Sequence, residues 1–271
     1  MRRSIDGAVV GMVSARYNPE GTWQRDTVWV VRAEEMIRLW EGVEVHDDDG
    51  ARTAEEAPDG GPDGIPAFLP VPPGHPSFWL SRHLVTNGQF RCFLNAEQNG
   101  RWCPGRARGG PDADDNYLRH WNGPAMPPAL ANFPVVNVGL VSARAYAAWL
   151  RGRLGAAARL PALSEWRIAA AAGRPGDWLS AELRAGRVNF RGTHARPTEV
   201  GDFGLNPYGF ADLVGQAYEM CAGESAEAVR CGGAFSTPRE RLEEISEISS
   251  PRECRADTGF RCALDTAPPG G

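Results

Sequence analysis

The sequence predicts an α+β fold built around one main domain. Three segments with helical periodicity lie between residues 86 and 173, and short strand candidates with glycine-rich turns follow them. Helices that are segregated from strands along the chain are typical of α+β domains. The chain has 271 residues, 42% of them hydrophobic, which is enough to bury one sizeable core and a small appendage.

Each of the three helix candidates carries a boundary signal and an apolar face. The first, TNGQFRCFLNAEQNG, has Thr86 as its N-cap and ends at Gly100. The second, SARAYAAWLRGRLG, has Ser142 as its N-cap, and the third, LSEWRIAAAAG, ends at Gly173. Beyond Gly173 we expect little further helix. The positions expected to face inward are Phe90, Phe93, Leu94, Ala145, Tyr146, Trp149 and Leu150.

The chain before the main domain has two different textures. Residues 1–46 contain the β-branched runs GAVVGMVSARY and DTVWVVRAEEMIRLWEGVEV, which predict a small β-rich extension. Residues 47–64 hold seven acidic residues against one arginine and almost no large apolar side chain, so we expect an acidic flexible linker or loop. The main domain is predicted over residues 65–265, and residues 266–271 are predicted to be a disordered tail.

The charged residues exclude several classes of function. The net charge is −5, so the chain has no overall positive field that would hold a nucleic acid. All 29 basic residues are arginine. Without lysine, the chain has neither a Schiff-base nucleophile nor the lysine of a phosphate-binding P-loop. Codon bias in a GC-rich genome is the simplest explanation of that absence.

The sequence predicts a cytoplasmic protein without a membrane partner. Its apolar run near the start, residues 8–13, is too short for a signal peptide, and no stretch approaches the ~20 apolar residues of a membrane span. The six cysteines show no CxxC pair, so we expect reduced cysteines in the core.

Seven motifs stand in series from about Phe78 to Ala263: FWLSRHLVTNGQFRCFL, NYLRHW, FPVVNVGLVSARAYAAWL, RLPALSEWRIAAAAG, GLNPYGFADLVGQAYEM, GGAF and GFRCA. In this order they resemble the landmarks of the formylglycine-generating enzyme (sulfatase-modifying factor) family. The resemblance implies a variant of the C-type lectin fold. It does not cover residues 1–64, and the Gly-Gly-x-Phe-x-Met-Gly strand that often opens the family domain is missing.

Three of these motifs also have structural explanations. In RLPALSEW, the carboxylate of Glu165 can cap or pair at the start of a helix. The glycines of GGAF permit positive φ or close backbone approach, and GFRCA places the apolar Phe260 beside the donor fork of Arg261. We interpret these motifs as scaffold.

The segment GFADLVGQAYEM predicts a calcium site. Calcium takes roughly six to eight oxygen ligands from carboxylates and backbone carbonyls. The resemblance implies that the side chains of Asp212 and Glu219 and the carbonyls of Gly215 and Ala217 hold one structural Ca²⁺. From the residues alone, a turn capped or salt-bridged by the two carboxylates is the favoured interpretation, and the family resemblance shifts the prediction to calcium. The family departures are Gln216 in place of Asn, and Tyr218 and Met220 in place of Trp.

The copper chemistry of the family is not expected here. Formylglycine-generating enzymes oxidise a substrate cysteine with a copper ion that two thiolates hold, and the resemblance places those two positions at Thr237 and Leu242. Neither side chain supplies the soft sulfur that suits Cu(I). The nearest thiol, Cys254, lies far downstream. We therefore expect no copper, and we assign no catalytic residue.

An iron site is a weaker alternative. The ergothioneine-type sulfoxide synthases carry the same fold, but their iron is held by histidines in a separate helical domain for which this chain has no room. The five histidines contain no HxxxH pair, so an iron site could arise only through tertiary contact.

Residues 234–258 are predicted to form a ligand-binding face. Their middle, TPRERLEEISEISSPRECRADT, is charged, and in lectin-type folds this region is an exposed surface used for ligands. Complementary charges would select a protein partner there, although a solvated surface remains possible. The face residues are Phe235, Thr237, Arg239, Arg241, Arg252 and Arg255.

Two functions follow from this reading. The first is a non-copper, non-catalytic lectin-fold binding module, stabilised by calcium, that recognises a protein or other ligand. The second is a divergent oxidase or hydroxylase that uses a non-copper metal. A variable protein of a diversity-generating retroelement is less favoured, because the face is not enriched in Asn, Ser and Tyr. The sequence leaves the partner's identity and the oligomeric state open.

Overall fold

The structure of the chain, a computed structural model, divides into two compact units, Met1–Glu55 and Glu56–Gly271. In the first unit it describes the backbone of three short strands. In the second it describes residues 64–74, 76–121, 125–174, 176, 178–223 and 228–269. The linker predicted over residues 47–64 therefore lies outside the described residues except for Gly64, as do the last two residues of the predicted tail.

The first unit contains an antiparallel sheet in the order β1-β2-β3. Its strands are β1 (Ser4–Ile5), β2 (Ala8–Val13) and β3 (Trp29–Arg32). Strands β2 and β3 lie within the two β-branched runs of residues 1–46, where valine and other β-favouring residues promote extended backbone.

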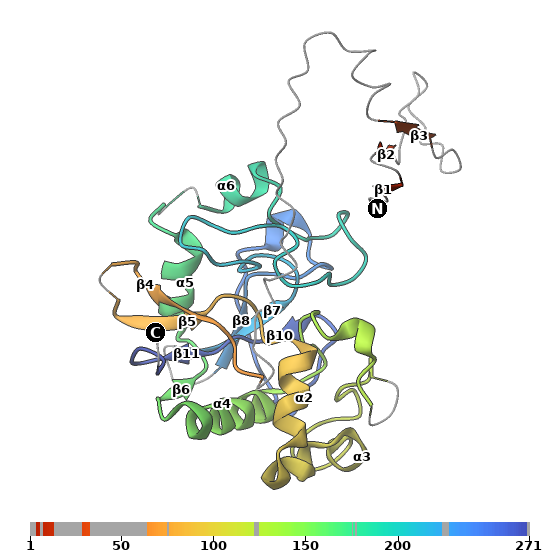
Figure 1. Cartoon of the computed structure of the whole chain (residues 1–271). Coiled ribbons are helices and arrows are strands. Elements are labelled where there is room, and N and C mark those ends of the chain that lie inside the picture. The colour runs from red at the N-terminus through yellow and green to blue at the C-terminus, as the bar shows by residue number, and fades with distance from the viewer. Residues whose placement is uncertain are drawn as a thin grey trace. The chain divides into compact units, whose positions relative to one another are not determined.

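The second unit contains two four-stranded sheets (Figure 1). The first, in the order β4-β5-β11-β6, is antiparallel throughout; its strands are β4 (Phe68–Val71), β5 (Phe78–Ser81), β11 (Ala263–Leu264) and β6 (Ala158–Arg159). The second, in the order β10-β7-β8-β9, has one parallel pair, β10 with β7; its strands are β7 (Tyr218–Ala222), β8 (Ala228–Cys231), β9 (Ser246–Glu247) and β10 (Thr258–Gly259). With the helices, these sheets confirm the predicted α+β class.

The helices of the described residues lie mostly before the second sheet in the chain. They are α2 (Asn87–Asn95), α3 (Pro104–Ala107), α4 (Leu140–Leu154), α5 (Leu163–Ala171) and α6 (Trp178–Arg184), with the 3₁₀ turns η1 (Glu97–Trp102), η2 (Pro128–Leu130) and η3 (Arg239–Arg241). Helix α6, of seven residues, lies beyond Gly173, where the sequence predicted little helix.

The predicted start of the first helix is confirmed. Thr86 has extended backbone and accepts a hydrogen bond from the N–H of Gln89, while the Gln89 side chain accepts one from the N–H of Thr86. This capping box satisfies two N–H groups that a helix start leaves unpaired. The helix ends at Asn95 rather than near Gly100, because the chain continues as the 3₁₀ turn η1.

The predicted start of the second helix is wrong. Helix α4 begins at Leu140 with Gly139 as its N-cap, so Ser142 lies within the first turn. The Ser142 hydroxyl donates to the Gly139 carbonyl instead of capping an N–H group. The helix ends at Leu154, and Gly155 adopts the left-handed conformation that terminates helices.

The structural role predicted for Glu165 is also confirmed. Its carboxylate makes two hydrogen bonds of 2.7 Å to the Arg159 guanidinium and accepts the N–H of Ala162 at 2.8 Å. Arg159 belongs to strand β6, so this bidentate pair fixes the start of helix α5 to the edge of the first sheet.

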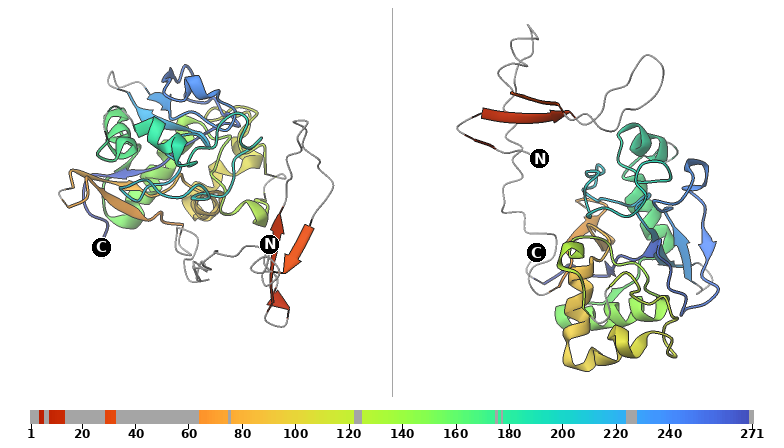
Figure 2. Two further views of the ribbon diagram at one scale, coloured as in Figure 1. Left: turned by 90° about the horizontal axis from the view of Figure 1, so that it is seen from above. Right: turned by 90° about the vertical axis from the view of Figure 1, so that its right-hand side faces the viewer.

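The first sheet separates two hydrophobic cores, because alternate residues along a strand point to opposite faces. Helices α2 and α4 lie on one side of the sheet and α5 on the other (Figures 1 and 2). On strand β11, Leu264 packs with the core of α2 and α4, whereas Ala263 packs with the core of α5.

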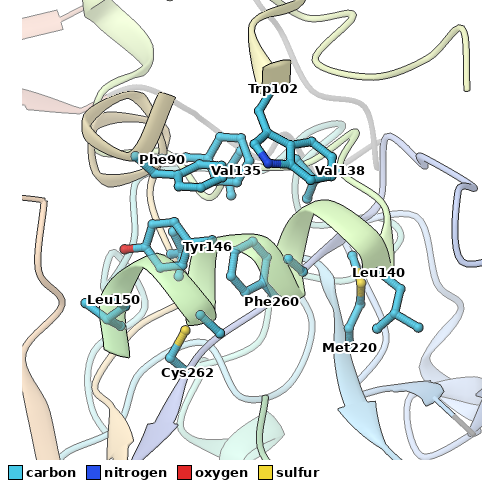
Figure 3. Packing of buried hydrophobic residues seen from close by; sticks show 14 of the residues in the cluster. Phe90, Trp102, Val135, Val138, Leu140, Tyr146, Leu150, Met220, Phe260 and Cys262 are labelled. Carbon is cyan, nitrogen blue, oxygen red and sulfur yellow. The ribbon is translucent and has the colours of Figure 1, made fainter. Parts of the chain in front are cut away.

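The core beneath α2 and α4 is aromatic (Figure 3). Tyr146 is fully buried, and its ring lies 5.4 Å from that of Phe260 and 5.9 Å from that of Phe90. The Tyr146 hydroxyl donates to the carbonyl of Gly64, so its polar end is satisfied. Phe260 comes from the GFRCA motif and confirms the predicted apolar anchor.

No helix among the described residues has both the length and the apolar character needed to cross a membrane.

Candidate functional site

The candidate site begins at the GGAF turn, where the backbone conformation requires two glycines. Gly232 and Gly233 have φ values of 86° and 69°. A Cβ on Gly232 would lie 2.7 Å from the Leu213 carbonyl oxygen, and one on Gly233 would lie 2.6 Å from Cδ2 of Leu242. Positive φ and close approach, both expected from the sequence, are therefore confirmed.

Thr237, at the first position where the family pattern has a copper ligand, is buried and internally hydrogen-bonded. Its Oγ1 accepts the N–H of Ala234 at 2.9 Å and donates to the Tyr218 hydroxyl at 3.0 Å. Tyr218 begins strand β7, so the threonine hydroxyl links the turn to the second sheet. Leu242, at the second position, is fully buried and packs with Val188 and Val214.

A cavity of about 270 Å³ opens beside Thr237, and we call it the arginine cavity. Six of its lining residues matter here: Arg191, Tyr218, Arg230, Thr237, Arg241 and Arg255. The cavity lies where β7, β8 and the turn η3 meet the segment around Arg191, whose N–H donates to the Thr237 carbonyl.

A second, larger cavity of about 740 Å³ adjoins the first, since Ser236, Arg255 and Asp257 line both. Its lining includes Asp114 and Phe235 and carries charges of both signs. The two cavities therefore lie next to each other along the predicted face.

The larger cavity also contains an imidazole and a thiol. Nε2 of His120 lies 2.9 Å from Oδ1 of Asn87, a carbonyl oxygen, so Nε2 donates, and Nδ1 is buried without a hydrogen-bond partner. Burial lowers the pKa of His120 to about 4. Burial, and then the charge of Asp114, raise the pKa of Cys254 to about 12, and its thiol donates to the Arg252 carbonyl. Both groups are neutral at pH 7.

The structure divides the predicted ligand-binding face. Phe235 lines the larger cavity, Thr237 and Arg241 line the arginine cavity, and Arg255 lines both. Arg239 and Arg252 line neither, and Arg252 donates to the Gly110 carbonyl.

Three residues of the arginine cavity were not expected from the sequence. Arg230 belongs to β8 and Tyr218 to β7, both outside residues 234–258. Arg191 donates from Nε to the Ser236 carbonyl, a contact between residues 45 positions apart. The departure of Tyr218 from the family's Trp was the one signal in the sequence, because it places a hydroxyl where an indole is usual.

The two acidic residues of the predicted calcium site, Asp212 and Glu219, form a buried group with Arg261 of the GFRCA motif, and we call it the Arg261 cluster. Arg261 and Glu219 are fully buried and joined by two hydrogen bonds of 2.6 and 2.7 Å. Arg261 also donates to the carbonyls of Ser81, Arg82 and Ala211. Parallel pairing of β10 with β7, which sets Gly259 opposite Glu219, brings these side chains together.

Asp212 carries a carboxylate that is only half satisfied. Its Oδ2 accepts the N–H of Gly201 at 2.7 Å, whereas its Oδ1 is buried without a hydrogen-bond partner among the described residues. Burial raises the pKa of Asp212, and the Gly201 N–H and the charges of His83 and Arg261 oppose that rise. Burial likewise raises the pKa of Glu219 against the opposing charge of Arg261.

The residues present fit a cation at the predicted calcium position. Two acidic side chains are buried here, which is costly without positive partners; Arg261 acts on both, and His83 also acts on Asp212. The orphan Oδ1 of Asp212 offers a ligand, and a carboxylate that binds arginine bidentately keeps further lone pairs. Positive φ at Gly215 and Gln216 turns the chain tightly between the proposed carbonyl ligands of Gly215 and Ala217. The calcium site itself stays a prediction.

The described residues contain no group of three or more His, Cys, Asp or Glu side chains that could hold a metal ion. The predicted calcium site is not a group of this kind, because it combines two acidic side chains with two backbone carbonyls.

Comparison with known families gives a match over most of the chain. The Sulfatase-modifying factor enzyme 1-like domain matches residues 33–266. This range contains all seven motifs of the sequence series.

Two curated relatives illustrate the range of similar proteins. The serine/threonine-protein kinase pkn1 of Chlamydia pneumoniae is 34% identical over 54% of this chain, and the match spans only 22% of that kinase. The formylglycine-generating enzyme of Mycobacterium tuberculosis is 29% identical, and the match covers 70% of this chain and 88% of the enzyme.

Among solved structures, Treponema denticola variable protein 1 is similar in fold. It superposes with a TM-score of 0.53 at 19% sequence identity, over 70% of this chain and 84% of that protein. At this identity, the likeness concerns the fold alone.

Proposed function

This chain belongs to the sulfatase-modifying factor family, and from that premise we propose that it is a non-copper binding module rather than a formylglycine-generating oxidase. The observation that carries the proposal is the hydrogen bond between Thr237 and Tyr218 at the first copper position. Two departures from the family pattern, a hydroxyl for a thiol and a phenol for an indole, are partners of each other. A metal ligand has been replaced by an internal bond.

The second copper position supports the same conclusion. Leu242 is fully buried against apolar neighbours, and its side chain offers no lone pair. Cys254 is a poor substitute for the missing thiolates, because its raised pKa keeps the thiol protonated at neutral pH.

A binding role is supported by the hollow along residues 234–258. The two adjoining cavities, of about 740 and 270 Å³, carry many charged groups, and complementary charge favours selective recognition of a protein partner. The match to a small part of a much longer kinase supports a module that works as one part of a larger assembly. The six free cysteines support a reducing, cytoplasmic location.

We further propose that one calcium ion stabilises the module at Asp212 and Glu219. The half-satisfied, buried carboxylate of Asp212 supports this role, and a structural ion would fix the loop that leads into strand β7.

A divergent oxidase or hydroxylase is the second candidate. It is favoured by the presence of His120, Asp114 and Cys254 around one cavity, where an imidazole Nδ1 has no partner among the described residues. The neutral thiol, and the absence of a metal-holding cluster in the described part of the chain, make this candidate weaker.

Copper binding and peptide oxidation test the proposal. We expect full-length protein purified without chelator to bind no Cu(I) and to leave a cysteinyl peptide unchanged under oxygen, as measured by metal analysis and mass spectrometry. Conversion of the cysteine to an aldehyde would overturn the proposal.

A double variant, Thr237→Cys with Leu242→Cys, provides the matched comparison. Both side chains approach Gly233, so two thiols there lie on one turn. We expect this variant to gain a Cu(I) site that the unmodified chain lacks.

A further inference from the structure

The arginine cavity concentrates positive charge beyond what its carboxylates can neutralise. Four guanidinium groups line it, those of Arg191, Arg230, Arg241 and Arg255, against the single carboxylate of Asp257. Asp257 is already engaged by Arg255 through bonds of 3.0 and 3.2 Å. Three guanidinium groups therefore remain around a hollow that has no negative lining group left.

These three arginines have little ionic pairing elsewhere. Arg241 pairs with Glu244 at 2.7 Å, but both side chains are about half exposed, so solvent weakens that attraction. Arg191 makes a side-chain hydrogen bond only to the neutral Ser236 carbonyl, and no ion pair of Arg191 occurs in the described ranges.

Arg230 is mostly buried and poorly paired, and this points most directly to a ligand. Its side chain is only 14% exposed, its nearest carboxylate, that of Glu253, is 3.9 Å away, and its Nε is buried without a hydrogen-bond partner in the described part of the chain. A buried donor without an acceptor costs about 1–3 kcal/mol of stability, and more if it is charged. Arg230 lines the cavity, so an anion there would bring a negative charge close to this poorly paired guanidinium.

Hydroxyl groups complete the lining. Because Thr237 donates to the oxygen of Tyr218, the proton of the Tyr218 hydroxyl is free to point to another acceptor. Ser236 and Ser246 also line the cavity. Every group left to bind a ligand is therefore a guanidinium or hydroxyl donor, a combination suited to oxyanions.

We propose that the arginine cavity binds a phosphate group carried by a side chain of a partner protein. Its donors come from the segment around Arg191, from strand β8 and from the turn η3, so they surround the hollow. A tetrahedral phosphate presents oxygens toward all three, whereas a planar carboxylate can satisfy only one or two forks at once. The inference rests on the proposed function, because it assigns a ligand class to the same face.

Inorganic phosphate is the first probe, titrated into the full chain by calorimetry at constant ionic strength. We expect saturable binding and a rise in the melting temperature, because a ligand of the folded state stabilises it by mass action. A chloride solution of equal ionic strength is the control. No binding, or an equal shift with chloride, would overturn the site.

Three peptides that differ at one position then identify the source of the anion. We expect a phosphoserine peptide to bind at least about tenfold more tightly than the same peptide with glutamate, and the serine peptide not to bind. Equal affinity for glutamate would overturn the preference for phosphate. Binding of free phosphate without binding of the phosphopeptide would overturn the assignment to a partner protein.

The variant Arg191→Gln tests the residues without disturbing the core, because Arg191 is exposed. We expect it to weaken binding of phosphate and phosphopeptide about tenfold, the effect of one lost charge-assisted hydrogen bond. Arg144→Gln, at an exposed arginine of helix α4, is the matched control and should leave affinity unchanged. An equal loss in both variants would show nonspecific attraction and overturn the proposal.

The outcomes separate this inference from the proposed function. A chain that neither oxidises cysteinyl peptides nor binds phosphate keeps the proposed function and loses the anion site. A chain that oxidises such peptides loses the proposed function, whatever its affinity for phosphate.

Discussion

The Arg261 cluster and the arginine cavity use the same side chain in opposite ways. Arg261 is fully buried, and every partner it binds belongs to the fold: one carboxylate and three backbone carbonyls. The arginines of the cavity border a solvent-open hollow and outnumber their carboxylate partners. A guanidinium whose donors are all satisfied internally stabilises one structure, whereas one with unused donors is available to a ligand.

The two regions differ in the groups that are left without a partner. In the Arg261 cluster, Oδ1 of Asp212 has no hydrogen-bond partner among the described residues, and this acceptor is a ligand for the proposed cation. In the arginine cavity the guanidinium groups outnumber the carboxylates, and these donors are ligands for the proposed anion. The domain thus offers a candidate structural ion site in its interior and a candidate recognition site on its face.

The largest effect on stability is expected from Glu219→Gln in the Arg261 cluster. It removes the carboxylate that is hydrogen-bonded to Arg261, and removing one partner of a buried pair costs about 3–5 kcal/mol. The free energy of unfolding from urea titration measures this loss. Glu165→Gln, in the partly exposed pair with Arg159, is the control and should cost clearly less. An equal loss in the free energy of unfolding for both variants would show that burial does not increase the contribution of the pair.

Calcium removal should have the next largest effect. Free calcium at 100 times its dissociation constant would stabilise the folded chain by about 2.7 kcal/mol. Melting curves with calcium and with chelator should therefore differ, and Asp212→Asn should abolish the difference while keeping the Arg261–Glu219 pair intact. Magnesium at the same concentration is the control. Identical curves for the unmodified chain with calcium and with chelator would rule out the calcium site.

The pH dependence sharpens this test. Because burial raises the pKa of Asp212, the folded chain holds a proton that the unfolded chain releases near pH 4. Without calcium, the stability from this proton is complete below that pH and is lost as the pH rises through the raised pKa. Calcium replaces the proton, so its stabilising effect, measured by thermal denaturation, should be greater at pH 7.5 than at pH 4.5. Equal stabilisation by calcium at the two pH values would show that the ion does not bind to Asp212.

The sequence predicted features that depend on neighbouring residues and missed those that depend on distant ones. The capping box at Thr86 and the glycines of the GGAF turn follow from local backbone geometry, and both were predictable. The pairing of Arg261 with Glu219 depends on parallel pairing of β10 with β7, which no short motif encodes. The meeting of Arg191 with the turn after Ala234 is equally nonlocal.

A smaller effect on stability is expected at the border of the arginine cavity. Thr237→Val removes the acceptor of the buried Ala234 N–H and the donor to Tyr218, at a cost of about 1–3 kcal/mol. Tyr218→Phe removes only the second bond and should cost about 1 kcal/mol. A double-mutant cycle by urea titration should show coupling between the two positions. Additive losses would mean that the two hydroxyls do not interact.

The smallest effect on stability, and the one that separates the two regions most clearly, is expected from Arg241→Gln. Arg241 lines the arginine cavity, but its side chain is 62% exposed and its pair with Glu244 is open to solvent, so the melting temperature should not change measurably. The affinity of this variant for phosphate should nevertheless fall, because it lacks one of the three guanidinium groups that are not paired with a carboxylate of the cavity lining. Glu244→Gln removes the same surface pair while keeping the guanidinium, so it should retain or raise the affinity. A lower melting temperature for Arg241→Gln would show that Arg241, like Arg261, stabilises the fold, and would contradict its assignment to the recognition surface.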